Sequence, residues 1–345
     1  MKLNRRGFLG GGAMFAAASM AGGCRSLFTG SASDYDDGLT VLLSDVHIGS
    51  SSVAPKYQPM KFEPIVAEIL RMDPLPRRVV VFGDIAWKAG IKGDYVASRP
   101  FFQQFIDVGI QVTLGMGNHD RRPSFLEVWP EYAKNSPVPG RIVSVVPLRD
   151  ADLVLLDSLK SEGGGVVEAN GYGEGVLDDA QQEWLADWAT KAKRPFFFGA
   201  HHPEFEPPSH SIMVKGTRID RFMLNFPLAA GYIHGHNHSW RASLKCLRWQ
   251  PDGQLPVMGL PSACYWGDIG YVLLRTSPDG AVATLRQKEH FFPRWTGEVA
   301  SNPAARPAAW AARTHNNNGQ TCLFPFPRAR PWTDGARDFT LEKAK

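Results

Sequence analysis

Five short apolar runs, each followed at once by a side chain that can bind a metal, constrain the fold of this chain more than any other feature. The runs begin at Leu39, Val79, Val112, Pro195 and Gly231. Apolar runs of this length that end in loop residues are typical of buried β-strands. Open α/β sheets bind their ligands at the carboxyl ends of their strands. The pattern therefore predicts an α/β fold in which loops from several strands meet at one site.

The central loop, Gly117-Asn118-His119-Asp120, has an ordinary alternative explanation when taken alone. Gly, Asn and Asp are also the usual residues of a tight turn. The other four runs decide between the two explanations, because each of them also delivers Asp or His at its end. Five such ends in series favour a metal site over a series of unrelated turns.

The residue types at the strand ends indicate the class of metal. The candidate ligands, in chain order, are Asp45, His47, Asp84, Asn118, His201, His236 and His238. Alternate side chains of an extended segment share a face, so Asp45 and His47 can point at the same ion. Carboxylate, carboxamide and imidazole together suit Mn, Fe, Co or Zn, whereas an all-oxygen set would suit Mg or Ca. The set contains no thiolate, so a structural zinc site is not expected.

Seven ligands exceed what one ion can use if it must also hold water and substrate. They divide naturally between two divalent or transition metal ions bridged by a carboxylate. Two ions about 3.5–4 Å apart can clamp a phosphoryl group and generate hydroxide from bound water. The expected cofactor is therefore a pair of such ions, whose identities the sequence leaves open.

The motifs in this order resemble the calcineurin-like metallophosphoesterase superfamily, over roughly Leu39 to Lys288. The resemblance implies an α/β fold, a four-layer α/β/β/α sandwich of two mixed sheets flanked by helices. It also implies a role for each ligand. The first ion would be held by Asp45, His47 and His238, the second by Asn118, His201 and His236, and Asp84 would bridge the two.

The same resemblance implies catalytic roles for His119 and Asp120. His119 would stabilise the transition state or protonate the leaving oxygen, and Asp120 would orient its imidazole. His201 is preferred to His202 as the ligand, because the family usually places that ligand two residues before Pro203. His202 could instead line the substrate pocket or be a polar neighbour in the loop.

The expected activity is hydrolysis of a small phosphodiester by attack of metal-bound hydroxide. The passage from Leu155 to Ser158 and the later Gln181-x-x-Trp184-Leu185 resemble the cyclic-nucleotide-phosphodiesterase-like branch of the superfamily. A phosphomonoesterase on the same metal core is the first alternative. The second is an inactive, surface-anchored binding protein on a phosphoesterase scaffold, which the complete ligand set and His119 argue against.

The first 24 residues are typical of an export signal, since a basic start precedes a short apolar stretch. Arg5-Arg6-x-Phe8-Leu9 resembles the signal read by the twin-arginine export machinery of bacteria, although a chance basic terminus is the alternative. Cys24 follows small residues, as in a lipoprotein processing site. The protein is therefore expected to cross the bacterial inner membrane, and to be periplasmic or tethered to a membrane surface through Cys24.

The remaining chain divides into a linker at 25–38, a phosphoesterase domain at 39–290 and an irregular C-terminal extension at 291–345. The expected helices are Pro64–Met72, Pro100–Val108 and Asp178–Lys191. The expected strands after the last ligand are Ala242–Trp249, Leu255–Leu260, Gly270–Thr276 and Ala281–Lys288. In the extension, Phe324, Phe326 and Trp332 favour packing over disorder.

Charge and cysteine content add two expectations. The formal net charge is only +4, and no basic run interleaved with aromatics is present, so a nucleic acid polymer is not expected as a partner. After export, Cys246, Cys264 and Cys322 would allow one disulfide and one free thiol, with the pair left open.

Overall fold

The computed structural model describes residues 34–49, 59–87, 89–160, 175–204, 212–214, 217–240, 256–265, 267–291 and 317–326. Several expected features lie outside these ranges. They are the export signal with Cys24, the linker up to residue 33, the expected strand Ala242–Trp249 with Cys246, and most of the C-terminal extension with Trp332. Within the described ranges, no helix combines the length and the apolar character needed to cross a membrane.

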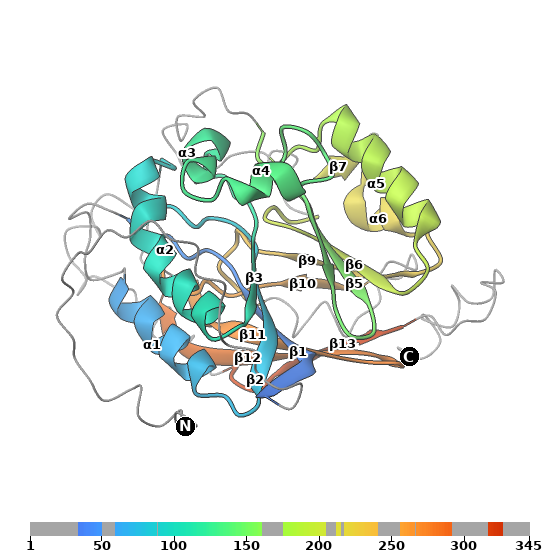
Figure 1. The fold of residues 1–345 in the computed structure, drawn as a ribbon. Helices are drawn as coiled ribbons and strands as arrows, with labels where there is room; N and C mark the ends of the chain where they lie inside the picture. Colours follow the sequence, from blue (N-terminus) through green and yellow to red (C-terminus); the bar gives the residue numbers. More distant parts are fainter. Residues whose placement is uncertain are drawn as a thin grey trace, which may run out of the picture.

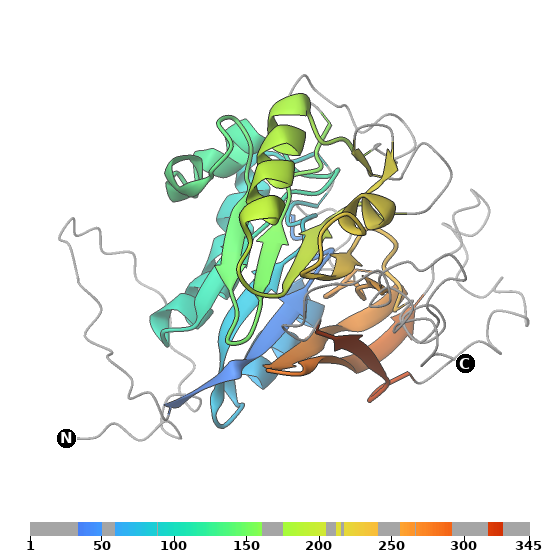
Figure 2. The same ribbon diagram turned by 90° about the vertical axis from the view of Figure 1, so that its right-hand side faces the viewer.

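Two mixed β-sheets form the centre of the molecule (Figure 1). The first has the strand order β13-β12-β11-β1-β2-β3. Its strands are β1 (Tyr35–Leu43), β2 (Leu75–Val81), β3 (Gln111–Leu114), β11 (Gly267–Ser277), β12 (Gly280–Phe291) and β13 (Thr321–Pro325). Strands β1 to β3 are parallel, whereas β11, β12 and β13 join antiparallel. Figure 2 shows the blue strand β1 beside the orange strands of this sheet.

The second sheet has the order β10-β9-β6-β5-β4. Its strands are β4 (Ser144–Pro147), β5 (Asp152–Leu155), β6 (Phe196–Ala200), β9 (Ala229–His234) and β10 (Val257–Gly259). All neighbours are parallel except β4, which pairs antiparallel with β5. A short hairpin, β7 (Met213–Val214) with β8 (Thr217–Arg218), lies outside both sheets.

Alternation along the strands produces the layers. In β1 and β2, Leu42 and Val80 pack between the two sheets, while Val41 and Val79 face the helices α1 (Pro59–Leu70) and α2 (Lys92–Asp107). Successive side chains of a strand point to opposite faces, so a strand buried on both sides reads as a continuous apolar run. The sequence shows such runs because both faces of each sheet are covered.

The second sheet repeats this arrangement with its own helices. Phe197 enters the core between the sheets, whereas Phe196 and Phe198 pack with residues of α5 (Asp179–Lys191) and α6 (Ile219–Met223). Figure 1 shows α1 and α2 on one side of the sheets and α5 and α6 on the other. The predicted four-layer α/β/β/α sandwich is confirmed. Two short helices, α3 (Arg122–Leu126) and α4 (Glu131–Asn135), follow the central loop.

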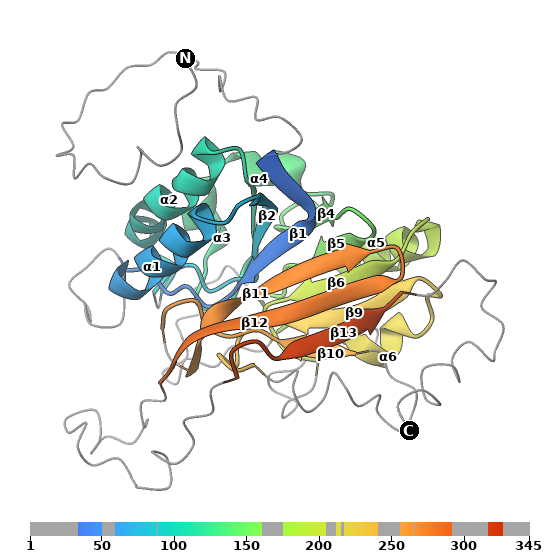
Figure 3. The ribbon, with the colours of Figure 1, turned by 90° about the horizontal axis from the view of Figure 1, so that it is seen from below.

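The edge strand β13 is the main element that the sequence did not predict. It pairs with β12, with Leu323 opposite Val282, and lies beside β12 in the view of Figure 3. Phe324 and Phe326 are buried in the core between the sheets, as their aromatic character indicated. The extension at 291–345 is therefore not irregular throughout, because this segment completes the first sheet. At the other end, β1 begins at Tyr35, inside the expected linker.

Two helices begin earlier than the sequence predicts, because each helix extends before the proline expected at its start. Pro64 lies inside α1 and Pro100 inside α2. In α2, the turns before Pro100 bury Tyr95 completely, and this packing offsets part of the cost of an internal proline, about 3 kcal/mol. The third helix begins as predicted, with the side chain of Asp178 accepting a hydrogen bond from the Gln181 backbone N–H.

Two of the three cysteines expected after the signal lie in the described part of the chain. Cys264 and Cys322 are buried thiols with no disulfide between them. Cys264 Sγ donates to the backbone carbonyl of Val46, at 2.7 Å. It therefore ties the segment before β11 to the loop after β1.

Candidate metal centre

The predicted ligands converge because they follow strands that end at the same edge of the two sheets. Asp45 and His47 follow β1, Asp84 follows β2, and Asn118 follows β3 in the first sheet. The ligands from the second sheet follow two of its strands: His201 follows β6, and His236 and His238 follow β9. The structure brings all seven together, although they span almost 200 positions of the chain.

Glycines let the loops that carry the candidate ligands approach one another. A Cβ on Gly117 would collide with the side chain and backbone nitrogen of Asp84, and one on Gly235 would collide with Ser44 Oγ and Asp45. Only a residue without a side chain fits where two loops are this close. The glycines before Asn118 and before His236 are therefore part of how the ligands are assembled.

The first ligand cluster consists of Asp45, His47, Asp84 and His238. One donor atom from each lies within 4.8 Å of all the others, and all four residues are buried. His238 Nε2 is 3.0 Å from Asp45 Oδ1, and His47 Nε2 is 3.5 Å from Asp84 Oδ2. His47 Nε2 and His238 Nε2 are 3.3 Å apart.

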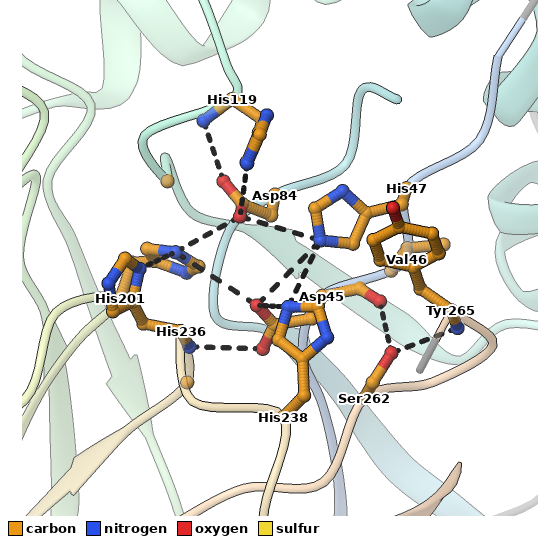
Figure 4. A network of polar contacts seen from close by, with 12 residues as sticks. Asp45, Val46, His47, Asp84, His119, His201, His236, His238, Ser262 and Tyr265 are labelled. Carbon is orange, nitrogen blue, oxygen red and sulfur yellow. Dashed lines mark hydrogen bonds and ion pairs between the residues drawn. The ribbon is translucent and has the colours of Figure 1, made fainter. Parts of the chain in front are cut away.

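The second ligand cluster consists of Asn118, His201 and His236, together with Asp84. Asn118 Oδ1 is 2.9 Å from both His201 Nε2 and His236 Nδ1, and these two nitrogens are 3.2 Å apart. His201 Nε2 is 3.2 Å from Asp84 Oδ2. The same oxygen thus faces an imidazole of each cluster, which is the position of a bridging ligand (Figure 4).

The ring nitrogens that point away from the centre are held by the backbone. His47 Nδ1 is 3.1 Å from the carbonyl of Trp87, and His201 Nδ1 is 3.0 Å from the carbonyl of Phe82. A carbonyl can only accept, so each Nδ1 carries the proton. This fixes the orientation of both rings and, with a neutral ring, leaves the Nε2 lone pair for a metal.

Burial and neighbouring charges shift the pKa values of the candidate ligands in different directions. Burial lowers the pKa of His47 to about 3, despite the nearby Asp84 carboxylate. Burial alone would also lower the pKa of His201, but Asp84 and Asp45 outweigh it and raise this pKa to about 9. Burial raises the pKa of Asp84, yet the neighbouring imidazoles of His201 and His119 hold this pKa well below its usual value. The carboxylate that faces both clusters is therefore ionised.

The surroundings of one buried oxygen fit a bound cation. Asp45 Oδ1 has no hydrogen-bond partner of acceptable geometry, although His238 Nε2 is 3.0 Å away. Leaving a buried carboxylate oxygen unsatisfied is costly, and bound metal is one of the usual compensations. Its neighbours are imidazole nitrogens and a second carboxylate, a donor set that suits a divalent transition metal.

Backbone strain is concentrated at the same residues. Every non-glycine residue with positive φ in the described part of the chain is a predicted ligand. These residues are Asp45, His47, Asp84, His236 and His238, with φ of 49–68°. Such a conformation costs on the order of 1–3 kcal/mol per residue and persists where the surrounding structure imposes it. The surrounding structure therefore holds these loops in the conformation that directs the ligand atoms toward the centre.

Comparison with known proteins agrees with this geometry. The family model for calcineurin-like phosphoesterases matches residues 39–240, more than half of the chain. The chain belongs to the calcineurin-like phosphoesterase family. No curated protein matches it by sequence.

Several solved structures resemble this calcineurin-like phosphoesterase. The structure of PhoD is 10% identical, with a TM-score of 0.47, and the match covers 89% of this chain and 76% of that one. TT1561 of Thermus thermophilus is 12% identical, with a TM-score of 0.44 and coverage of 69% and 93%. Vps29 of Entamoeba histolytica complexed with Zn²⁺ is 11% identical, with a TM-score of 0.33 and coverage of 72% and 92%.

His119 lies at the centre, but Asp120 does not hold its imidazole as predicted. The backbone N–H of His119 donates to Asp84 Oδ1 at 2.8 Å, and its Nε2 is 4.0 Å from Asp84 Oδ2. The carboxylate of Asp120 instead accepts hydrogen bonds from Gly117, Ile85, Ala86 and the hydroxyl of Tyr95. The four bonds are 2.9–3.3 Å long. Asp120 therefore connects the loop after β2 to the loop after β3.

His202 is buried beside the ligands. Its Nδ1 is 2.8 Å from Ser158 Oγ, and its ring centroid is 4.9 Å from that of His236. The Nε2 of His201, not of His202, approaches Asp84, which agrees with the choice of His201 as the candidate ligand.

A buried ion pair that connects the sheets carried no motif in the sequence. Arg122 Nε and Nη2 donate to the two carboxylate oxygens of Asp157, at 2.6 and 2.8 Å. Arg122 begins α3, directly after the central loop, and Asp157 follows β5 of the second sheet. Bidentate geometry and burial make this pair a rigid connection between the loop of Asn118 and the opposite sheet.

Trp87 and Tyr265 are two partly exposed aromatic residues beside the first cluster. No sequence motif predicted a position at the site for either of them. The ring centroid of Tyr265 lies 4.6 Å from that of His47 and 5.6 Å from that of His238. Trp87 follows Asp84 by three residues and packs against Tyr265. Their closeness to the ligands depends on the meeting of the loop after β2 with the segment before β11, which local patterns do not show.

Proposed function

We propose that this calcineurin-like phosphoesterase is an exported, metal-dependent phosphodiesterase that acts on a small phosphodiester. The observation that carries the metal-dependent part is the position of Asp84 Oδ2, 3.5 Å from His47 Nε2 and 3.2 Å from His201 Nε2. One carboxylate oxygen between two sets of imidazoles fits a pair of bridged divalent ions. Asp45, His47, Asp84 and His238 would hold the first ion, and Asp84, Asn118, His201 and His236 the second.

Bound ions would supply the positive charge that attracts phosphoryl oxygens and lowers the pKa of a water molecule. The residues of the chain supply orientation and a proton. His119 has 18% of its side chain exposed and its ring centroid lies 5.0 Å from that of His47. It can therefore reach a phosphoester at the centre and donate to the departing oxygen.

The preference for a diester rests on the resemblance of residues 155–185 to the cyclic-nucleotide-phosphodiesterase-like branch. In the structure, two of these residues support each other: the Gln181 amide donates to the Asp157 carbonyl and accepts from the Asp157 N–H, at 2.9 Å each. A phosphomonoesterase would use the same metal core, so the choice needs a measurement on substrates.

The deciding experiment compares an aryl phosphate monoester with the matching diester, using the Mn-loaded full chain. We expect a higher kcat/KM for the diester, and we expect Asn118→Ala to abolish most of this activity. A preference for the monoester would replace the diesterase with the monoesterase. Equal activity in the variant would assign the turnover to a contaminant, and negligible turnover with Mn, Fe, Zn and Co would favour the inactive binding protein.

Export is a separate part of the proposal and rests on the sequence of residues 1–24. Replacing Arg5 and Arg6 together by Lys should retain the protein in the cytoplasm, if the twin-arginine machinery reads this signal. Cys24→Ser tests the tether, because loss of lipidation would release the exported protein from the membrane fraction. Unchanged fractionation of both variants would remove these two elements and leave the phosphodiesterase proposal intact.

A further inference from the structure

Trp87 and Tyr265 form two walls of a corner beside the first ligand cluster. Their ring centroids are 4.7 Å apart, and their planes meet at 78°. Both side chains are partly exposed, although most large aromatic side chains in the described part of this phosphoesterase are buried. A third aromatic ring placed between two planes at nearly a right angle can stack on one plane and point its edge at the other. Stacked and edge-to-face contacts are the two arrangements that aromatic rings prefer.

The backbone fixes both walls to the ligands. The carbonyl of Trp87 accepts the hydrogen bond from His47 Nδ1. On the other side, Ser262 Oγ donates to the carbonyl of Asp45 at 2.8 Å and accepts from the Tyr265 N–H at 2.9 Å (Figure 4). Trp87 is thus one hydrogen bond, and Tyr265 two hydrogen bonds, from a candidate ligand of the first ion. The corner has a defined position relative to the phosphate that the ions would hold.

Packing inside the protein accounts for only part of this arrangement. Tyr265 contacts the rings of His47 and His238, so one function of the pair is to hold those imidazoles. Exposed aromatic surface this close to a metal centre is available to the substituent of a bound phosphoester.

We infer that Trp87 and Tyr265 select phosphoesters whose alcohol carries a planar aromatic ring, by stacking that ring in the corner between them. This inference rests on the proposed function, since it assumes a phosphoryl group held by the two ions. It adds the class of substituent, which neither the family nor the ligand set specifies.

The test measures binding, so it does not depend on turnover. Phenylphosphonate and methylphosphonate share an anionic group, differ in the ring, and have a carbon–phosphorus bond that this hydrolysis does not break. Calorimetric titration of the Mn-loaded full chain should give a Kd for phenylphosphonate about tenfold lower than for methylphosphonate. Trp87→Ala and Tyr265→Leu should each reduce this ratio to about two or less, because only phenylphosphonate loses a stacking partner. The matched control Tyr265→Phe keeps the ring and should keep the ratio.

The outcomes separate this inference from the proposed function. A ratio of the two Kd values near one in the unaltered protein overturns the inference. An equal loss of affinity for both phosphonates in the variants also overturns it, because the rings would then only hold His47. If the ratio is as expected but no aryl phosphoester is hydrolysed, the corner stands and the phosphodiesterase proposal fails. If diesters are hydrolysed but the ratio of the two Kd values is one, the phosphodiesterase proposal stands and the inference about Trp87 and Tyr265 fails. If neither phosphonate binds, both proposals fall.

Discussion

The two ligand clusters of this phosphoesterase share Asp84 but differ in charge and burial. The first has a second carboxylate, Asp45, and all of its side chains are buried. The second has the neutral amide of Asn118 instead, and both Asn118 and His236 are partly exposed. Because a buried carboxylate binds a divalent ion more strongly than an exposed amide does, we expect the first cluster to hold its ion more tightly. We expect the second cluster to release its ion first.

The largest effect should come from the residue that both clusters share. Asp84→Asn keeps the shape but removes the negative charge that faces His47 and His201. We expect the metal content to fall below one ion per chain and kcat/KM to fall more than about a hundredfold, since lesser changes around metal ligands already cost about 10–100-fold. Metal analysis after gel filtration and steady-state kinetics measure the two quantities. A variant with two ions and full activity would show that Asp84 does not bridge.

The second-largest effect should show that the two ligand clusters hold different ions. Asn118→Ala removes an oxygen that lies 2.9 Å from a nitrogen of His201 and of His236. We expect one ion per chain to remain and the rate to fall about a hundredfold. His47→Ala is the matched change in the first cluster, and it should remove the more tightly held ion. If both variants lose the same ion, or if chelator removes both ions of the unaltered protein in one step, the clusters do not differ as their composition indicates.

Proton release should distinguish the clusters by pH. In the metal-free protein the pKa of His201 is raised to about 9, so its ring is protonated at pH 7, whereas the pKa of His47 is about 3 and its ring is neutral. An ion must displace the His201 proton from Nε2, so affinity for the second ion should rise about tenfold per pH unit up to about pH 9 and then level off.

Calorimetric titration with metal at pH 7, in buffers of different ionisation enthalpy, measures this release. The heat of the second binding step should depend on the buffer more strongly than the heat of the first step. The dependence should disappear in His201→Gln. A second step whose heat is the same in every buffer would contradict the assignment.

The sequence could predict features that depend on neighbouring residues, but not features that depend on contacts between distant parts of the chain. The convergence of the candidate ligands could be predicted, because strand periodicity and the residue type at each strand end are local features, as in Val79 to Asp84. The position of β13 could not, because Leu323 pairs with Val282 across some 40 residues. The corner of Trp87 and Tyr265 joins positions far apart in the chain, and no local pattern marks either residue. The partners of Asp120 were mistaken for a similar reason, because three of its four donors come from residues 25–35 positions away.

The smallest effect concerns the hydrogen bonds that Asp120 makes between the two loops. Tyr95 OH donates to Asp120 Oδ1 at 3.1 Å and accepts from the Arg121 N–H at 2.7 Å, and Tyr95 is completely buried. Tyr95→Phe keeps the ring packing and leaves Asp120 three backbone donors. We expect a loss of about 1–2 kcal/mol in the free energy of unfolding and at most a few-fold change in rate.

Thermal unfolding and steady-state kinetics measure these effects, with Tyr132→Phe as the control. Tyr132 is a second tyrosine whose hydroxyl joins backbone groups, accepting from the Leu114 N–H at 2.9 Å and donating to the Val112 carbonyl. Both variants should lose similar stability and keep their activity. If Tyr95→Phe alone lowered the rate by more than about tenfold at equal stability, then Asp120 would act on the chemistry of His119, as the sequence indicated. If the two variants behave alike, Asp120 acts only by holding the loop that carries Asn118 against the loop of Asp84.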